Sequence, residues 1–288
     1  MSGSVPEDAP SLCPGPGKDL HIRFLRAPQL SLAKVPEVTA TFWVIKILTT
    51  GMGEAASDYL AKISLALAAG VGVTGFVAAL WLQFRATRYV PAVYWSAVSM
   101  VAVFGTMAAD GAHKALGVPY VVTSIFYAVA VAAIFLTWHR QERTLSIHSI
   151  VTRPREVFYW ATVLATFALG TAAGDLTAFT LHLGYRTSAL VFAVAILVPL
   201  LAWRTRRLGG IAAFWCAYVL TRPLGASIAD WLGKPKALSG LGFGDGPVTL
   251  VACVAIAGLV ALAHRGANDV QSPESVEGDP QRPLSLKC

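Results

Sequence analysis

The amino-acid sequence predicts an all-α integral membrane protein whose eight transmembrane helices form four two-helix repeats. Of its 288 residues, 55% are hydrophobic and only 14% are charged, whereas a soluble domain carries about 25% charged residues. The mean hydropathy is +0.59, and the apolar residues gather in long stretches. This composition excludes a soluble globular protein, a disordered chain and a disulfide framework.

Eight apolar stretches have about the 20 residues that a transmembrane helix needs. They are 36–59, 63–84, 91–112, 119–138, 157–179, 187–203, 210–232 and 247–264. Residues 34–264 are therefore expected to form one membrane domain. The flanking segments 1–33 and 265–288 are rich in proline, glycine, serine and charge, which is typical of flexible tails.

The basic residues predict the orientation of these helices. The loops after the second, fourth and sixth stretches carry nine arginines, and the other loops carry five lysines and arginines. Because cytoplasmic loops hold the excess of basic residues, both tails are expected in the cytoplasm. Met1–Pro10 lacks the basic start and apolar run of a signal peptide. The basic residues form no single patch, so the expected partner is the lipid bilayer and not nucleic acid.

A short motif recurs four times along the chain. An aromatic residue and a tryptophan begin the motif, and glycine and aspartate follow ten and fifteen residues after the tryptophan. The copies are Trp43, Gly53 and Asp58; Trp95, Gly105 and Asp110; Trp160, Gly170 and Asp175; and Trp215, Gly225 and Asp230. They divide the membrane domain into repeats at about 34–84, 89–138, 153–203 and 208–264, expected as two duplicated halves. Two helices per repeat keep all copies in one orientation, about an axis along the membrane normal.

Each motif residue has its own interpretation. Glycine lets membrane helices approach closely, and a tryptophan near a helix start is typical of the cytoplasmic interface. An aspartate inside a membrane helix is costly and by default marks a functional site. The alternative is that the four aspartates bond neighbouring helices or cap the next segment.

The first repeat carries the most polar residues. Lys46, Thr50, Glu54 and Asp58 recur every four residues and so form one polar stripe along a helix. The stripe should face the bundle interior or a wet cavity. Glu54 and Asp58, one turn apart, suit a set of cation ligands or a proton relay. Alternatively, Lys46 forms an internal ion pair with a carboxylate of another helix.

The fourth repeat contains Arg222-Pro223 inside its first helix. Proline removes a backbone hydrogen bond and kinks a helix, and Arg222 near the middle of the bilayer needs a carboxylate or carbonyl partner. A buried charge in a kinked helix is a candidate site or gate. An arginine that is paired only for assembly is the competing interpretation.

The charges expected inside the membrane have a negative sum. They are Lys46 and Arg222, against Glu54, Asp58, Asp110, Asp175 and Asp230, which gives −3 if all are ionised. This sign favours a cation or protons over an anionic substrate. Oxygen ligands suit hard cations such as Mg²⁺, Mn²⁺ or Ca²⁺, and the sequence leaves any metal unidentified.

The first motif and the residues before it resemble a known family. Lys34–Thr39, Phe42-Trp43 and Gly53-Glu54 resemble a bacterial family of membrane-anchored proteins built from tandem two-helix repeats of unknown function. The resemblance covers all four repeats, although the later copies lack equivalents of Lys46 and Glu54. It implies eight helices and a bacterial inner-membrane location, and it carries no activity.

The leading functional hypothesis is a transporter that moves a cation or is coupled to protons. Its binding or relay residues would be Glu54, Asp58, Asp110, Asp175 and Asp230, and Lys46, Thr50 and Arg222 would be counter-charges or gating residues. The alternative is a scaffold or sensor whose buried charges are structural. The chain has no Ser/His pair, HExxH or GxSxG motif, so neither enzymatic activity nor a cofactor is expected, and the oligomeric state is left open.

Overall fold

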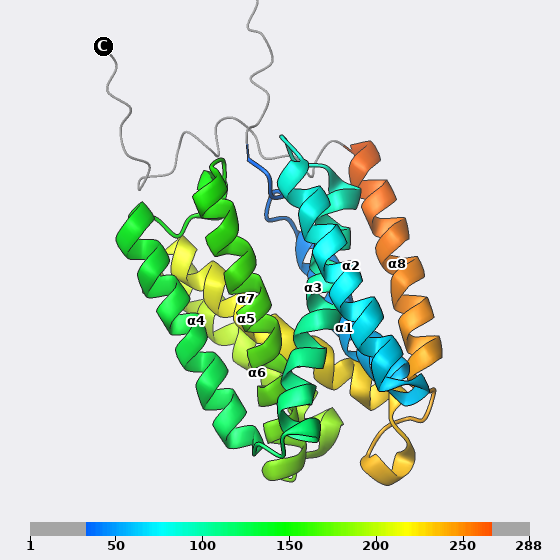
Figure 1. Ribbon diagram of the computed structural model, residues 1–288. Coiled ribbons are helices and arrows are strands. Elements are labelled where there is room, and N and C mark those ends of the chain that lie inside the picture. The colour runs from blue at the N-terminus through cyan, green and yellow to red at the C-terminus, as the bar shows by residue number, and fades with distance from the viewer. Residues whose placement is uncertain (1–32, 267–288) are drawn as a thin grey trace, which may run out of the picture. The chain divides into compact units, whose positions relative to one another are not determined.

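The computed structural model describes residues 33–266, and this part of the chain contains eight α-helices and no β-strand (Figure 1). The helices are α1 Ala40–Ile63, α2 Leu65–Arg85, α3 Pro91–Asp110, α4 Tyr120–Glu142, α5 Arg153–Asp175, α6 Gly184–Arg204, α7 Gly210–Gly233 and α8 Asp245–Gly266. Apart from their inner ends, the predicted tails 1–33 and 265–288 lie outside the described residues.

Seven of these helices are long and apolar enough to cross a membrane, and they indicate a multi-pass membrane protein. The exception is α1, because Lys46, Glu54, Asp58 and Lys62 make it too polar to qualify by composition. The eight predicted helices are therefore present, and seven of them qualify as membrane spans by length and composition.

Local signals determine where several helices begin. The Thr39 hydroxyl accepts a hydrogen bond from the Phe42 backbone N–H at 3.2 Å, so α1 begins at Ala40 and not at the predicted residue 36. The Ser64 hydroxyl accepts from the Leu67 N–H in the same way and separates α2 from α1. A proline lies in the first turn of α3 and of α5. Backbone N–H groups of the first turn have no acceptor inside the helix, so the missing N–H of proline removes no hydrogen bond there.

The first helices of the four repeats form an inner ring, defined here as α1, α3, α5 and α7. Each packs against the next, and α7 packs back against α1. Every outer helix packs on the inner helix of the following repeat: α2 on α3, α4 on α5, α6 on α7, and α8 on α1. The same relation therefore recurs at each step around the ring, and the last repeat closes on the first.

The motif glycines lie where neighbouring inner helices touch. A Cβ atom on Gly53 would overlap Ala102, and one on Gly105 would lie 2.7 Å from the Cβ atom of Phe167. The remaining two contacts are Gly170 with Arg222 and Gly225 with Thr50. Each partner stands three residues before the motif glycine of its own repeat, so one small-residue contact is used four times, as close helix packing predicts.

The motif tryptophans are buried inside the bundle, with the partial exception of Trp43. Trp95, Trp160 and Trp215 are only 2%, 3% and 5% exposed. They pack on Tyr94, Tyr159 and other rings at the N-terminal ends of the inner helices. The indoles of these three therefore face the neighbouring inner helices.

The segment before α1 is also anchored inside the protein. The Lys34 backbone N–H donates to the Ile150 carbonyl at 3.2 Å, and its ammonium bonds Glu156 of α5 at 2.6 Å. Gln83 of α2 donates to the second oxygen of Glu156 at 3.4 Å. Lys34 belongs to the stretch Lys34–Thr39 that resembles the repeat family, and it thus connects the segment before α1 to α5.

Candidate functional site

Three polar groups lie on the inner ring. We name them the Arg222 network, the carboxylate cluster and the Lys46 cage, and each is defined below by its residues. They follow one another along the helices because equivalent positions of the repeats face one another inside the ring. An apolar groove between three helices lies apart from these groups and is described after them.

The Arg222 network joins all four inner helices. Arg222 is 0% exposed, and its Nη2 donates to Glu54 Oε2 at 3.0 Å, to Thr171 Oγ1 at 2.8 Å and to Thr106 Oγ1. Its Nη1 donates to the Thr50 carbonyl at 3.2 Å. Arg222 therefore has both kinds of partner that a buried arginine needs, and α7 continues through the adjacent proline.

Repeat symmetry explains the geometry of this network. Glu54, Thr106 and Thr171 stand eleven residues after their motif tryptophans, and Ala226 stands at the same position of the fourth repeat. The small Ala226 leaves space that the guanidinium fills. Glu54 also accepts from the Thr106 hydroxyl at 3.3 Å and from the Thr171 hydroxyl at 3.2 Å.

The carboxylate cluster is formed by Glu54, Asp58 and Asp230, which are all buried. Each offers an oxygen, and these oxygens lie within 4.8 Å of one another. Glu54 belongs to both groups, so the cluster continues directly from the Arg222 network. Glu54 and Asp58 come from one turn of α1, and Asp230 comes from the last turns of α7.

Lys234 completes the cluster, and it was not among the site residues predicted from the sequence. Its ammonium bonds Asp58 and lies 3.5 Å from Asp230 and 3.8 Å from Asp245. Burial alone would lower the pKa of Lys234, but the nearby carboxylates of Asp230 and Asp58 outweigh burial and raise that pKa above its ordinary value. Asp245 is also paired with Lys62. The available signal was the four-residue spacing from Asp230 to Lys234.

The added ammonium changes the predicted charge sum. Five acidic side chains now face three basic ones, Lys46, Arg222 and Lys234, which leaves two negative charges instead of three. Asp245 and Lys62 cancel each other. The expected sum of −3 did not include Lys234.

Replacing Lys234 with glutamine should destabilise the protein, because it leaves three carboxylates close together without their shared cation. We expect a loss of about 1.5–3 kcal/mol, measured by thermal unfolding in detergent. A raised pKa means that Lys234 stays charged at all pH values below its ordinary pKa, so the loss should be constant between about pH 6 and 9. Lys236→Gln, at an exposed position two residues away, is the control. An unchanged melting temperature for Lys234→Gln would contradict this account.

Asp110 and Asp175 occupy the equivalent positions of the second and third repeats. They are buried at the C-terminal ends of α3 and α5, where each helix continues as a π-helical turn. Among the described residues, neither belongs to the group whose oxygens meet within 4.8 Å. The structure thus brings together two of the four motif aspartates, with Glu54 as the third member.

The Lys46 cage consists of Lys46, Phe167 and Tyr218. Lys46 is 1% exposed, and its Nζ lies 4.1 Å from the ring centroid of Phe167 and 4.2 Å from that of Tyr218. Within residues 33–266, this nitrogen has no hydrogen-bond partner. The alternative of an ion pair between Lys46 and a carboxylate of another helix is therefore wrong for the described structure.

Thr50 connects the cage to the network. Its hydroxyl donates to the Ile47 carbonyl at 2.6 Å, and its own carbonyl accepts from Arg222. The whole stripe of Lys46, Thr50, Glu54 and Asp58 is buried. Its residues therefore face other helices, as their spacing indicated.

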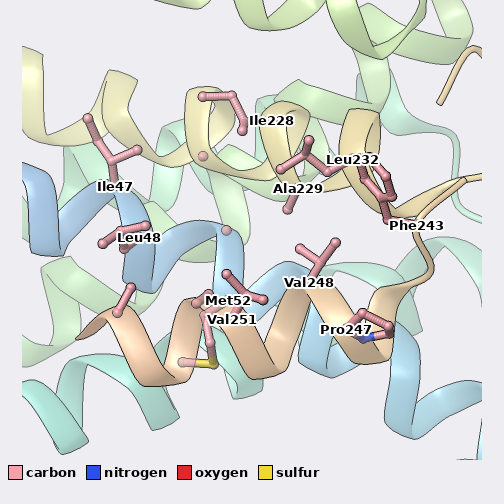
Figure 2. A pocket seen from close by; sticks show the side chains of 14 residues that line it. Ile47, Leu48, Met52, Ile228, Ala229, Leu232, Phe243, Pro247, Val248 and Val251 are labelled. Atoms are coloured by element: carbon pink, nitrogen blue, oxygen red, sulfur yellow. The ribbon is translucent and has the colours of Figure 1, made fainter. Parts of the chain in front are cut away.

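An apolar groove lies between α1, α7 and α8 and has a volume of about 480 Å³. Figure 2 shows its lining, which includes Leu48 and Met52 of α1, Ile228 of α7 and Val248 of α8. All 14 lining residues are apolar or glycine. The groove has none of the polar side chains that would orient a ligand, so it is separate from the three polar groups.

Comparison with protein families supports the repeat pattern. The model described as Repeat of Unknown Function (DUF347) matches four times, at residues 41–89, 93–144, 158–208 and 213–267. These four matches confirm the predicted tandem repeats and cover most of the chain. No curated protein and no solved structure matches the chain.

Proposed function

Because the chain belongs to the family of the Repeat of Unknown Function (DUF347), whose name assigns no activity, we propose its function from the geometry of the polar groups. The protein is a membrane transporter that moves a cation or couples a solute to protons. Glu54, Asp58 and Asp230 form its binding group. Asp110 and Asp175 are relay residues, and Lys46, Thr50 and Arg222 act as counter-charges or gating residues.

The carboxylate cluster is the observation that carries this proposal. Three buried acidic oxygens within 4.8 Å of one another repel each other unless a proton or a cation lies among them. Lys234 supplies one positive charge, and an incoming cation or proton can replace it. Carboxylate oxygens are the ligands that hard divalent cations prefer.

The same geometry supports a membrane-crossing α1. Its charged side chains Lys46, Glu54 and Asp58 are buried against the other inner helices, so lipid does not meet them. With α1 as the eighth span, both ends of the chain lie on one side of the bacterial inner membrane. The excess of arginines in the loops after α2, α4 and α6 supports the cytoplasmic side.

Flux through sealed proteoliposomes tests the proposed function. The native protein should move at least one of Mg²⁺, Mn²⁺, Ca²⁺, a monovalent cation or protons. Asp58→Asn and Asp230→Asn should each reduce this flux at least tenfold, because an amide oxygen is a weaker cation ligand and cannot hold an exchangeable proton. Glu142→Gln removes an acid that is ion-paired with Arg155 outside the cluster, and it should leave the flux unchanged.

One outcome of the flux experiment would contradict the proposed role of the carboxylate cluster. Equal flux in the native protein and in both aspartate variants, each checked to be folded, would exclude the cluster as the transport site. Absence of flux for every cation tested would instead favour the second candidate function.

The second candidate is a non-transporting scaffold or sensor, and the Arg222 network favours it. One guanidinium bonds residues of α1, α3 and α5, which is the role of a structural tie between helices. In that case Asp58→Asn and Asp230→Asn would reduce the amount of folded protein, and the surviving protein would behave as the native one does.

A further inference from the structure

Lys46 differs from the other buried charges of the inner ring. Lys234 touches carboxylates and Arg222 touches Glu54, but the Lys46 ammonium lies against the faces of Phe167 and Tyr218. Within the described chain, its nitrogen makes no hydrogen bond. A positive charge here is stabilised by the two rings alone.

Helix packing does not require a lysine at this position. The equivalent residues of the second and third repeats are Val98 and Val163, and that of the fourth is Tyr218. Both valines are fully buried, so an apolar side chain fits the same place in the ring. Burying an amine without a partner costs several kcal/mol, and Lys46 therefore needs an explanation besides packing.

The groups that face Lys46 do not hold its amine in the protonated state. On α7 they are Tyr218 and the Arg222 guanidinium, whose carbon lies 5.0 Å from the centroid of the same Phe167 ring. On α5 the facing side chain is Phe167, which has no charge. On α1 the nearest carboxylate along the stripe is Glu54, two turns away and already bonded to Arg222. The site thus holds one fixed positive charge and no carboxylate that is free to fix a second.

We propose that Lys46 carries the proton in the transport cycle, so that the coupling ion of this protein is H⁺. This inference rests on the proposed transport function. In one half of the cycle, a hydronium ion loses an O–H bond and the lone pair of the Lys46 Nζ forms an N–H bond, which gives an ammonium between the two rings and a water molecule. In the other half, that N–H bond breaks, a water molecule takes the proton through a new O–H bond, and the neutral amine remains.

Two substitutions distinguish a proton carrier from a fixed charge. Arginine keeps its proton at all relevant pH values, and methionine cannot take one. If Lys46 must gain and lose a proton, Lys46→Arg and Lys46→Met both lose proton movement. If Lys46 is only a counter-charge, Lys46→Arg should retain it.

The experiment uses proteoliposomes that contain a pH-sensitive dye, with cation flux and proton flux recorded together under a pH gradient. We expect at least a tenfold loss of proton flux in both Lys46 variants. Lys236→Arg and Lys236→Met, at an exposed position, should match the native protein. Thermal unfolding identifies the folded variants, and if Lys46→Arg does not fold, proton flux that a folded Lys46→Met retains still overturns the inference.

The remaining outcomes overturn the role of Lys46, the proposed transport function, or both. Native proton flux in Lys46→Arg, or in a folded Lys46→Met, would show that Lys46 does not carry the proton. Cation flux by the native protein without proton movement would overturn the inference and leave the proposed transport function in place. A native protein that moves neither ion would overturn both.

Discussion

Replacing Arg222 with methionine should destabilise the folded protein by about 3–5 kcal/mol. The methionine removes the partner of Glu54 and leaves that carboxylate buried among Thr106 and Thr171. It also removes the bonds from α7 to the Thr50 carbonyl and to the two threonine hydroxyls. Thermal unfolding in detergent, followed by tryptophan fluorescence, measures the loss.

A second substitution shows whether the lost ion pair is the cause. Glu54→Gln in the Arg222→Met background removes the unpaired charge and should recover at least half of the stability. Arg140→Met removes an exposed arginine of α4 and should leave the melting temperature unchanged. If Arg222→Met unfolds at the same temperature as the native protein, the network contributes no net stability.

Replacing Gly225 with alanine should destabilise the protein by about 1–3 kcal/mol, because it adds a methyl group to a filled contact. A Cβ atom there would overlap the Thr50 hydroxyl and lie 2.9 Å from the Ile47 carbonyl. The hydroxyl can rotate away, whereas the carbonyl belongs to the backbone of α1. The methyl group should therefore push α7 away from α1.

Gly258→Ala is the matched control for this prediction. Gly258 is also inside a helix, α8, and a Cβ atom there meets nothing within 4 Å. Alanine favours a helix over glycine by about 1 kcal/mol, so this variant should be as stable as the native protein or more stable. Equal effects of the two substitutions would contradict the close contact between α1 and α7.

Much of the fold could be predicted from the sequence because the repeat carries its own signals. The spacing from tryptophan to glycine and aspartate identified the four repeats, and the glycines indicated close helix packing. Hydropathy placed eight helices, but it missed local caps, so the predicted start at residue 36 lies before the true start at Ala40. The predicted 187–203 likewise begins late, because α6 extends back through Arg186 to Gly184.

The candidate site was less predictable because its partners come from different repeats. The need of Arg222 for a partner followed from its burial, but no spacing indicated Glu54, Thr106 and Thr171 together. Lys234 was missed because a lysine just after a helix end is typical of a solvated loop. The tryptophans were assigned to the interface because their position along the helix indicates how deep they lie in the membrane. It does not indicate whether the indole faces lipid or the neighbouring helices.

The closure of the ring by α8 has a consequence for biosynthesis. Ribosomes release the N-terminal repeat first, so α1 reaches the membrane with Glu54 and Asp58 long before Arg222 and Lys234 exist. Its covering helix, α8, is made after the other seven described helices. The most polar of the described helices must therefore wait in a provisional environment, such as the insertion machinery, until α7 and α8 have been made. A nascent chain that stops before α7 leaves these acids without their cations.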